Sequence, residues 1–155
     1  MTVVACRDGV MASDSLVTYA EAGQAGNRYS NTKKLYKMPN GAILAGSGNP
    51  SSFNTMAGVI KKLIVKRKPI NASSIKPFDG VDCLYLDLDG VCWSFIGGPS
   101  GGIMKLEGAF FADGSGCDVA LAAMHCGAGA ERAVEIAILL NTGCGPPVQS
   151  MRLDE

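Results

Sequence analysis

The start of the chain carries residues that could perform nucleophilic chemistry without a histidine. Thr2 follows Met1, and its small side chain favours removal of that methionine. An N-terminal threonine has a hydroxyl and a free amine on one residue. An α-amine has a pKa of about 7.7–8.0, so it can act as a general base at neutral pH. A lysine cation nearby would keep the amine neutral and polarise the hydroxyl. Lys33 and Lys34 lie in the strand-like stretch 31–38, where side chains alternate between faces, so only one of them can point inward.

A second chemistry is considered for Leu-Asp-Leu-Asp-Gly-Val at positions 86–91. This segment resembles the nucleophile motif of haloacid-dehalogenase-type phosphatases, and 112–118 resembles their acidic, Mg²⁺-binding segment. Asp87 would then attack phosphate. The motif lies in the middle of the chain, however, and Asp89-Gly90 is a strong hairpin signal. The favoured interpretation is a turn.

Other motifs indicate structure rather than chemistry. The glycine-rich stretch 97–102 lacks the Gly-Lys-Ser/Thr ending of a phosphate-binding loop. The six cysteines form no Cys-x-x-Cys pair, and His125 is the only histidine, so no metal site is expected. These patterns predict no metal or organic cofactor.

The elements that must position Thr2 are predicted to be mainly hairpins. Asp8-Gly9 turns a first hairpin that brings Thr2 near Asp14 and Ser15, while 18–30 is expected to be a loop. The remaining predicted elements are a hairpin over 31–46, a helix from Pro50 with Asn49 as N-cap, a basic linker over 66–77, a hairpin over 81–96, a strand over 108–113, helices over 117–127 and 131–140, and a strand over 147–152. Strands joined as hairpins favour antiparallel sheets over a parallel one.

The composition excludes several classes of function. Hydrophobic residues make up 47% of the 155 residues and charged residues 18%, so a folded core is expected. Fourteen cationic and fourteen acidic residues balance, which gives no footprint for a nucleic acid or an anionic membrane. No apolar run is long enough to span a bilayer, and no signal peptide is evident. A cytoplasmic homo-oligomer is the expectation.

Four stretches follow one another in a recognisable order: MTVVACRDGVMASDSLVT, NTKKLYKM, AILAGSG and FFADGSGCDVALAAM. Together they resemble the proteasome β-subunit and bacterial HslV group of N-terminal threonine hydrolases, nearest to the short bacterial proteasome homologues. The resemblance covers nearly the whole chain. It implies an α+β fold, a four-layer αββα sandwich of two antiparallel sheets between helix layers, formed by residues 1–155 as a single domain.

The resemblance also implies roles for individual residues. Thr2 would be the nucleophile and its own amine the base, Asp14 would hold the lysine, and Lys34 would be that lysine. The backbone N–H of Gly46 would form the oxyanion hole, and Ser115 would orient the terminal amine.

Further positions carry supporting roles by the same resemblance. Lys33 precedes the inward lysine, Asn141 stands where the family has a supporting acid, and Cys144 where it has a hydroxyl. The side-chain pocket for the substrate would be lined by Val17, Thr32, Leu44 and Gly48.

The function that this resemblance implies is threonine-type peptide-bond hydrolysis inside a self-compartmentalised ring. The partners would be further copies of the chain in a stacked double ring, sixfold or sevenfold with sevenfold (a 14-mer) favoured, polypeptide substrates, and an ATP-dependent unfoldase. The alternative is a catalytically weak or inactive structural subunit of the same ring, which Asn141 and Cys144 favour.

Overall fold

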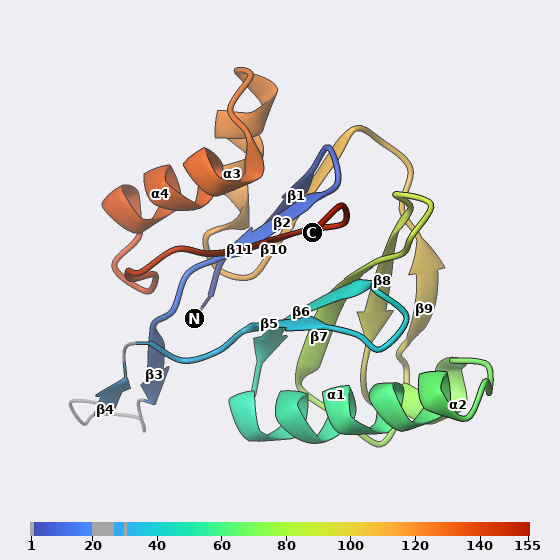
Figure 1. Cartoon of the computed structure of the whole chain (residues 1–155). Helices are drawn as coiled ribbons and strands as arrows, with labels where there is room; N and C mark the ends of the chain where they lie inside the picture. Colours follow the sequence, from blue (N-terminus) through green and yellow to red (C-terminus); the bar gives the residue numbers. More distant parts are fainter. Residues whose placement is uncertain (1, 20–26, 30) are drawn as a thin grey trace.

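Two antiparallel sheets lie face to face in the middle of the molecule, and helices cover their outer faces (Figure 1). The computed structural model describes residues 2–19, 27–29 and 31–155. The first sheet has the order β10-β1-β2-β11 and comprises β1 (Val4–Arg7), β2 (Val10–Ser13), β10 (Phe110–Asp113) and β11 (Gln149–Arg152). The second has the order β5-β6-β7-β8-β9 and comprises β5 (Leu35–Lys37), β6 (Ile43–Gly48), β7 (Val81–Leu86), β8 (Cys92–Ile96) and β9 (Gly102–Lys105).

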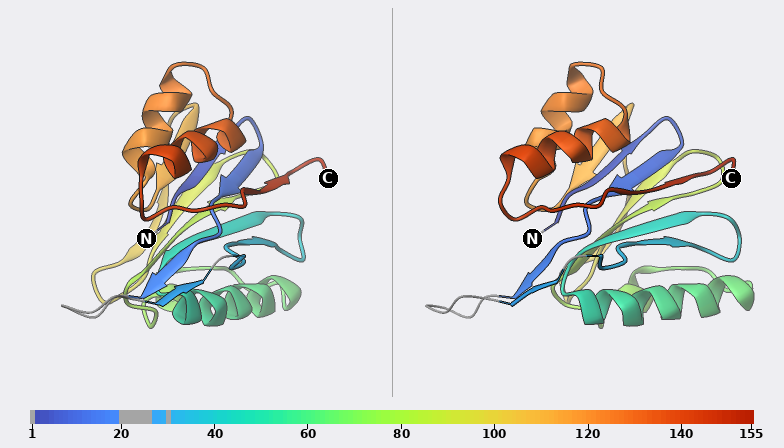
Figure 2. Two further views of the ribbon diagram at one scale, coloured as in Figure 1. Left: turned by 90° about the vertical axis from the view of Figure 1, so that its left-hand side faces the viewer. Right: turned by 60° about the vertical axis from the view of Figure 1, so that its left-hand side comes forward.

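The helices form the two outer layers. Helices α1 (Pro50–Val65) and α2 (Ala72–Ile75) cover the five-stranded sheet, and α3 (Cys117–His125) and α4 (Ala130–Leu140) cover the four-stranded sheet. The layering persists when the molecule is turned (Figure 2). The predicted four-layer αββα architecture is therefore confirmed. None of the helices in the described residues is long and apolar enough to cross a membrane.

Each interface between layers is filled by its own cluster of buried side chains. One cluster joins the five-stranded sheet to α1 and α2, and another joins the four-stranded sheet to α3 and α4. The cluster between the two sheets includes Val4, Met11, Leu35, Ile43 and Leu84. Since β1, β2, β5 and β6 each contribute to this middle layer, residues at the ends of these strands are held at fixed positions relative to one another.

The local sequence explains the elements nearest the chain start. Asp8 and Gly9 both have positive φ (52° and 74°), as a two-residue hairpin turn between β1 and β2 requires. Asn49 caps α1 by accepting hydrogen bonds from the backbone N–H groups of Ser51 and Ser52, and Pro50 opens the helix. The hairpins predicted at 31–46 and 81–96 are also present.

Three regions of the chain differ from the sequence-based expectation. Residues 18–30, expected to be a loop, include parts of β3 (Val17–Tyr19) and β4 (Asn27–Tyr29), which pair with each other; the rest of that stretch lies outside the described residues. The linker over 66–77 contains the short helix α2, because Ile75 is fully buried against the core under α1. The strand β9 was not predicted, since Gly102 to Lys105 follows a glycine-rich turn and none of its residues is fully buried.

The N-cap of α1 gives a direct test of this part of the fold. Asn49→Ala removes the acceptor of two helix N–H groups and is expected to lower the free energy of unfolding by about 1 kcal/mol. Urea denaturation followed by circular dichroism measures the loss. Asn71→Ala is the matched control, because the Asn71 side chain accepts only from serine hydroxyls and does not cap the backbone of α2. An equal loss in both variants would contradict the assignment.

Candidate active site

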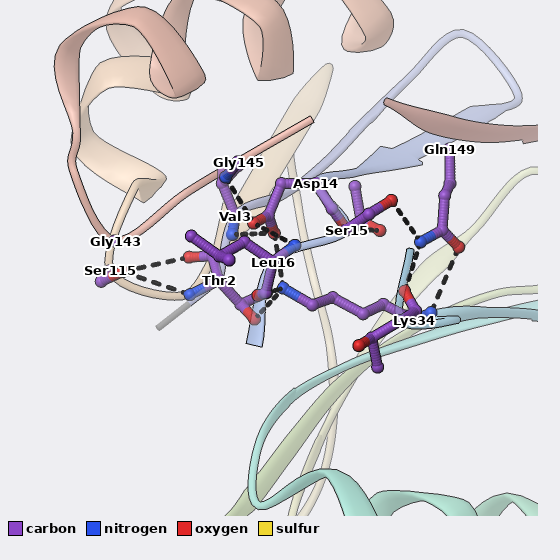
Figure 3. A network of polar contacts seen from close by, with 12 residues as sticks. Thr2, Val3, Asp14, Ser15, Leu16, Lys34, Ser115, Gly143, Gly145 and Gln149 are labelled. Carbon is purple, nitrogen blue, oxygen red and sulfur yellow. Dashed lines mark hydrogen bonds and ion pairs between the residues drawn. The ribbon is translucent and has the colours of Figure 1, made fainter. Parts of the chain in front are cut away.

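A buried lysine lies at the centre of a polar network between the two sheets (Figure 3). Lys34 immediately precedes β5 and its side chain is 5% exposed. Its Nζ donates to Thr2 Oγ1 at 2.7 Å, to Asp14 Oδ1 at 2.7 Å, and to the carbonyl oxygen of Leu16. These three acceptors match the three N–H bonds of an ammonium group. Burial lowers the pKa of Lys34, and the adjacent Asp14 carboxylate opposes that shift.

Asp14 follows the end of β2 and is fully buried. Besides the bond from Lys34, its Oδ1 accepts from the N–H of Val3 at 3.1 Å, and its Oδ2 accepts from the N–H groups of Leu16 at 3.2 Å and Gly145 at 3.1 Å. Hydrogen bonds to a carboxylate favour its charged form. The network therefore holds a paired ammonium and carboxylate in a buried site.

Thr2 is held on the side opposite Lys34 by the turn between β10 and α3. The Thr2 N–H donates to Ser115 Oγ at 3.2 Å, and the Ser115 hydroxyl and the Gly116 N–H both lie within bonding distance of the Thr2 carbonyl oxygen. Gly114 has a φ of +90°, and a Cβ there would lie 2.3 Å from the Thr2 carbonyl oxygen. Only glycine allows the turn to approach Thr2 this closely.

Asn141 and Cys144, the two positions expected to support the site, both lie next to this turn. Asn141 donates through Nδ2 to the Ser115 carbonyl oxygen at 3.0 Å, so it fixes the backbone of the turn. Cys144 is 5% exposed, and burial together with the nearby Asp14 carboxylate raises the pKa of its thiol to about 11. A thiol with that pKa is neutral at physiological pH. The cysteine is therefore a small buried side chain at this position rather than a nucleophile.

The two consecutive lysines point in opposite directions. Lys34 enters the network, whereas Lys33 is exposed and places its ammonium 4.8 Å from the centre of the Tyr36 ring, a cation–π contact. Alternation along an extended chain accounts for the difference.

A pocket of about 40 Å³ opens beside Thr2. Three of the four residues expected to line it do so: Val17, Thr32 and Gly48. Leu44 does not, because its side chain is fully buried in the core between β6 and α1. Its place is taken by Phe53 of α1, whose ring lies directly against Gly46. The other lining residues are Thr18, Lys33, Lys34, Gly46, Ser47 and Pro50.

The N–H group of Gly46, expected to serve as the oxyanion donor, has a partner within the chain. It donates to the Lys34 carbonyl oxygen at 3.2 Å, at the point where the pairing of β5 with β6 begins. Gly46 itself lines the pocket beside Thr2. An acyl oxygen bound at this position would have to replace the Lys34 carbonyl as the acceptor.

Sequence reasoning missed Gln149, which lies at the start of β11. Its Oε1 accepts from the Lys34 N–H at 3.2 Å, and its Nε2 donates to Ser15 Oγ at 2.7 Å and to the Thr32 carbonyl oxygen. No motif marks this residue. The only signal in the sequence was a polar residue inside a predicted strand, which does not by itself indicate an inward-facing contact.

The phosphatase-like motifs do not converge. Asp87 accepts from the N–H groups of Asp89 and Val91 and from Trp93 Nε1, so it closes the turn after β7. Asp113 contacts Ser47, which pairs with Asp82 at the opposite end of β7. Within the described residues, no group of His, Cys, Asp and Glu side chains is arranged to hold a metal ion.

The two antiparallel sheets between helix layers form the αββα sandwich expected from the sequence. By sequence, no protein-family model and no curated protein matches the chain. Solved structures do match over nearly their full lengths. BPH from Thiobacillus denitrificans in complex with epoxomicin is 19% identical with a TM-score of 0.65, and the match covers 99% of each chain.

Two further structures give the same result. Thiobacillus denitrificans BPH is 19% identical with a TM-score of 0.63, covering 99% of this chain and 98% of that one. HslV from Trypanosoma brucei is 11% identical with a TM-score of 0.66, covering 97% of this chain and 98% of that one. At these identities the likeness establishes the fold, and the HslV-like fold expected from the sequence is confirmed.

The buried ion pair can be tested through stability. Asp14→Asn leaves the Lys34 ammonium buried without its counterion and is expected to cost about 3 kcal/mol of unfolding free energy. Lys34→Met should cost less, because Asp14 keeps the N–H donors of Val3, Leu16 and Gly145. Urea denaturation of both single variants and the double variant measures the coupling energy. Purely additive losses would show that the two charges do not interact.

Proposed function

We propose that the chain is a threonine-type peptidase of the proteasome and HslV family. The observation that carries the proposal is the position of Lys34 Nζ, which lies 2.7 Å from both Thr2 Oγ1 and Asp14 Oδ1 in a buried network. Removal of Met1 would convert the Thr2 N–H, already oriented by Ser115, into a free amine.

In the proposed reaction, the Thr2 hydroxyl attacks a peptide carbonyl. Because Lys34 donates to Thr2 Oγ1, the hydroxyl proton is free to pass to the α-amine of the same residue. A bond forms between Oγ1 and the carbonyl carbon, and the carbon–nitrogen bond of the peptide then breaks as the departing amine takes up a proton. Water hydrolyses the resulting ester and restores the hydroxyl. Lys34 stabilises the developing negative charge on Oγ1 throughout.

The Gly46 N–H is the proposed donor to the carbonyl oxygen in the tetrahedral intermediate. Its bond to the Lys34 carbonyl is 3.2 Å long and lies at the end of the β5–β6 pairing, where one bond can be exchanged without disrupting the ladder. One oxyanion donor contributes about 3 kcal/mol to transition-state stabilisation. Val17, Thr32 and Phe53 would receive a small or apolar substrate side chain in the adjacent pocket.

We further propose that the active form is a ring. The fold is shared with HslV and BPH, and the resemblance of the sequence implies stacked sixfold or sevenfold rings, sevenfold being favoured. Access to the site inside such a ring would be restricted to unfolded polypeptides, which is why an ATP-dependent unfoldase is a proposed partner. The cytoplasm is the proposed location.

A non-catalytic ring subunit is the second candidate. Two observations favour it: the Gly46 N–H is bonded to Lys34, and a neutral Cys144 thiol replaces the expected hydroxyl. Both candidates share the ring and differ only in the reactivity of Thr2.

Covalent labelling separates the two candidates. Incubation with epoxomicin, the compound bound by BPH, or with a β-lactone is expected to add one inhibitor mass per chain, located on Thr2 by peptide mapping. Thr2→Ala should remain unlabelled, and Thr2→Ser should react at a reduced rate. Intact-mass spectrometry reads the adduct, and native mass spectrometry of the same sample reads the ring.

The controls address the α-amine. An N-terminal tag should abolish labelling because it blocks the amine, whereas a C-terminal tag should leave it intact. An unlabelled ring from which Met1 has been removed would support the non-catalytic subunit. Equal labelling of wild type and Thr2→Ala would overturn the proposed nucleophile.

The pH dependence of labelling should be bell-shaped. The rate rises as the α-amine loses its proton, at or below its ordinary pKa of about 7.7–8.0, because the nearby Lys34 ammonium disfavours the protonated amine. It falls again as Lys34 loses its proton. Burial lowers the pKa of Lys34, so this alkaline fall should occur below 10.5 rather than at it. The labelling rate, measured from reactions quenched at set times between pH 6 and about 11, gives both the acidic and the alkaline limb of this pH profile.

Lys34→Arg provides the check on this assignment, since a guanidinium stays charged across the range. The variant should react more slowly and lose the alkaline fall. An alkaline limb that is unchanged in Lys34→Arg would assign it to another group.

A further inference from the structure

Gln149 connects three segments that surround the site but are far apart in the sequence (Figure 3). It lies on β11, the edge strand that pairs with β2 through Gln149 opposite Ser13. Its side chain reaches across to the other sheet and bonds the backbone on both sides of Lys33: the Thr32 carbonyl oxygen and the Lys34 N–H. It also donates to Ser15 Oγ, next to Asp14.

These contacts require an amide. The Lys34 N–H can only donate and the Thr32 carbonyl can only accept, so one side chain must accept and donate at the same time. A carboxylate would supply only acceptors, and a thioether or hydrocarbon would supply neither function with comparable strength. Glutamine therefore fits these two partners, and its Oε1 and Nε2 have only one consistent orientation.

Within the part of the chain that the structure describes, the N–H is the one main-chain group of Lys34 that bonds the four-stranded sheet. The Lys34 carbonyl bonds Gly46 within the five-stranded sheet, whereas the Lys34 N–H bonds Gln149 of the other sheet. The Lys34 side chain must cross the gap between the sheets to reach Thr2 and Asp14. Gln149 thus fixes the point from which the lysine side chain starts, relative to the sheet that carries its two partners.

We propose that Gln149 is a positioning residue for Lys34. Through its bonds to the backbone, Gln149 holds the lysine ammonium beside the Thr2 hydroxyl and keeps Thr32 in its place at the edge of the substrate pocket. This inference rests on the proposed function for its consequence in catalysis. It assigns no direct contact with substrate to Gln149. Its effect is transmitted through its bonds to the Lys34 and Thr32 backbone and to the Ser15 hydroxyl.

Loss of the Gln149 amide should therefore change the position and the pKa of Lys34 as well as the rate of labelling. In Gln149→Met, a side chain of similar length, the 32–34 backbone keeps the bond from the Thr32 N–H to the Ser15 carbonyl oxygen (3.0 Å) but loses both bonds to Gln149, so the ammonium spends time away from Thr2 Oγ1. Labelling of Thr2 is expected to slow by about tenfold to a hundredfold, as misplacement of a catalytic group by about 1 Å does. With greater access to water, the pKa of Lys34 should move up, toward its ordinary value.

The experiment compares wild type, Gln149→Met, Gln149→Glu and Ser150→Ala as folded full-length chains. Ser150 is the matched control: it is the next residue on β11, and its hydroxyl bonds Glu131 on the α4 side. Two quantities are measured for each protein, the rate of labelling by epoxomicin and the Lys34 titration midpoint from lysine-selective NMR. Both Gln149 variants should slow labelling, and Gln149→Met, which adds no charge, should raise the midpoint, while Ser150→Ala should match wild type. Gln149→Glu keeps the side-chain shape and provides the test if the methionine variant does not fold.

The two measurements separate the present inference from the proposed function. An unlabelled wild-type protein would overturn the proposed function, but the Lys34 titration midpoints from NMR would still test whether Gln149 positions Lys34. If both Gln149 variants had the same labelling rate and the same Lys34 titration midpoint as wild type, the positioning role would be overturned. An equal effect of Ser150→Ala would also overturn it, because anchoring of β11 in general would then explain the result.

Discussion

The ion pair between Lys34 and Asp14 is the constraint on which the site depends. Both groups are buried between the sheets, where an unpaired charge would be strongly destabilising. Both charged groups are fully hydrogen-bonded. The ammonium donates to three acceptors, and the carboxylate accepts from three backbone N–H groups in addition to the lysine. Among the described residues, no buried side-chain nitrogen or oxygen lacks a hydrogen-bond partner. Satisfying this pair places Thr2 beside the lysine, because its hydroxyl is one of the three acceptors.

The partners of this pair come from both sheets and from both ends of the chain. Asp14 extends β2, Lys34 leads into β5, and the N–H of Gly145 comes from the segment before β11. The middle core cluster keeps the sheets in register, so that a side chain from one can meet the backbone of the other. Small residues at the turn before α3 complete the arrangement by letting that turn touch Thr2. The site is thus a property of the packed layers and does not reside in one loop.

Much of this arrangement could be predicted from the residues. Asp8-Gly9 fixed the first hairpin and its register, and Asn49-Pro50 fixed the start of α1, because both are local signals with a direct backbone cause. The order of motifs correctly indicated the fold. Leu44 was wrongly assigned to the pocket, since alternation along β6 does not reveal that Phe53 covers the same face. Gln149 and the bond from Gly46 to Lys34 could not be foreseen, because each depends on how two sheets approach one another in space.

The attachment of Thr2 has a consequence for how the chain could mature. Its carbonyl oxygen lies within bonding distance of two donors of the 114–116 turn, its hydroxyl accepts from Lys34, and Val3 is bonded to Asp14. All of these restraints lie on the C-terminal side of the Thr2 nitrogen. Cleaving the peptide bond that precedes Thr2 would break none of them. The new terminus would need no refolding step to reach its working position, so trimming before or after assembly would yield the same local structure.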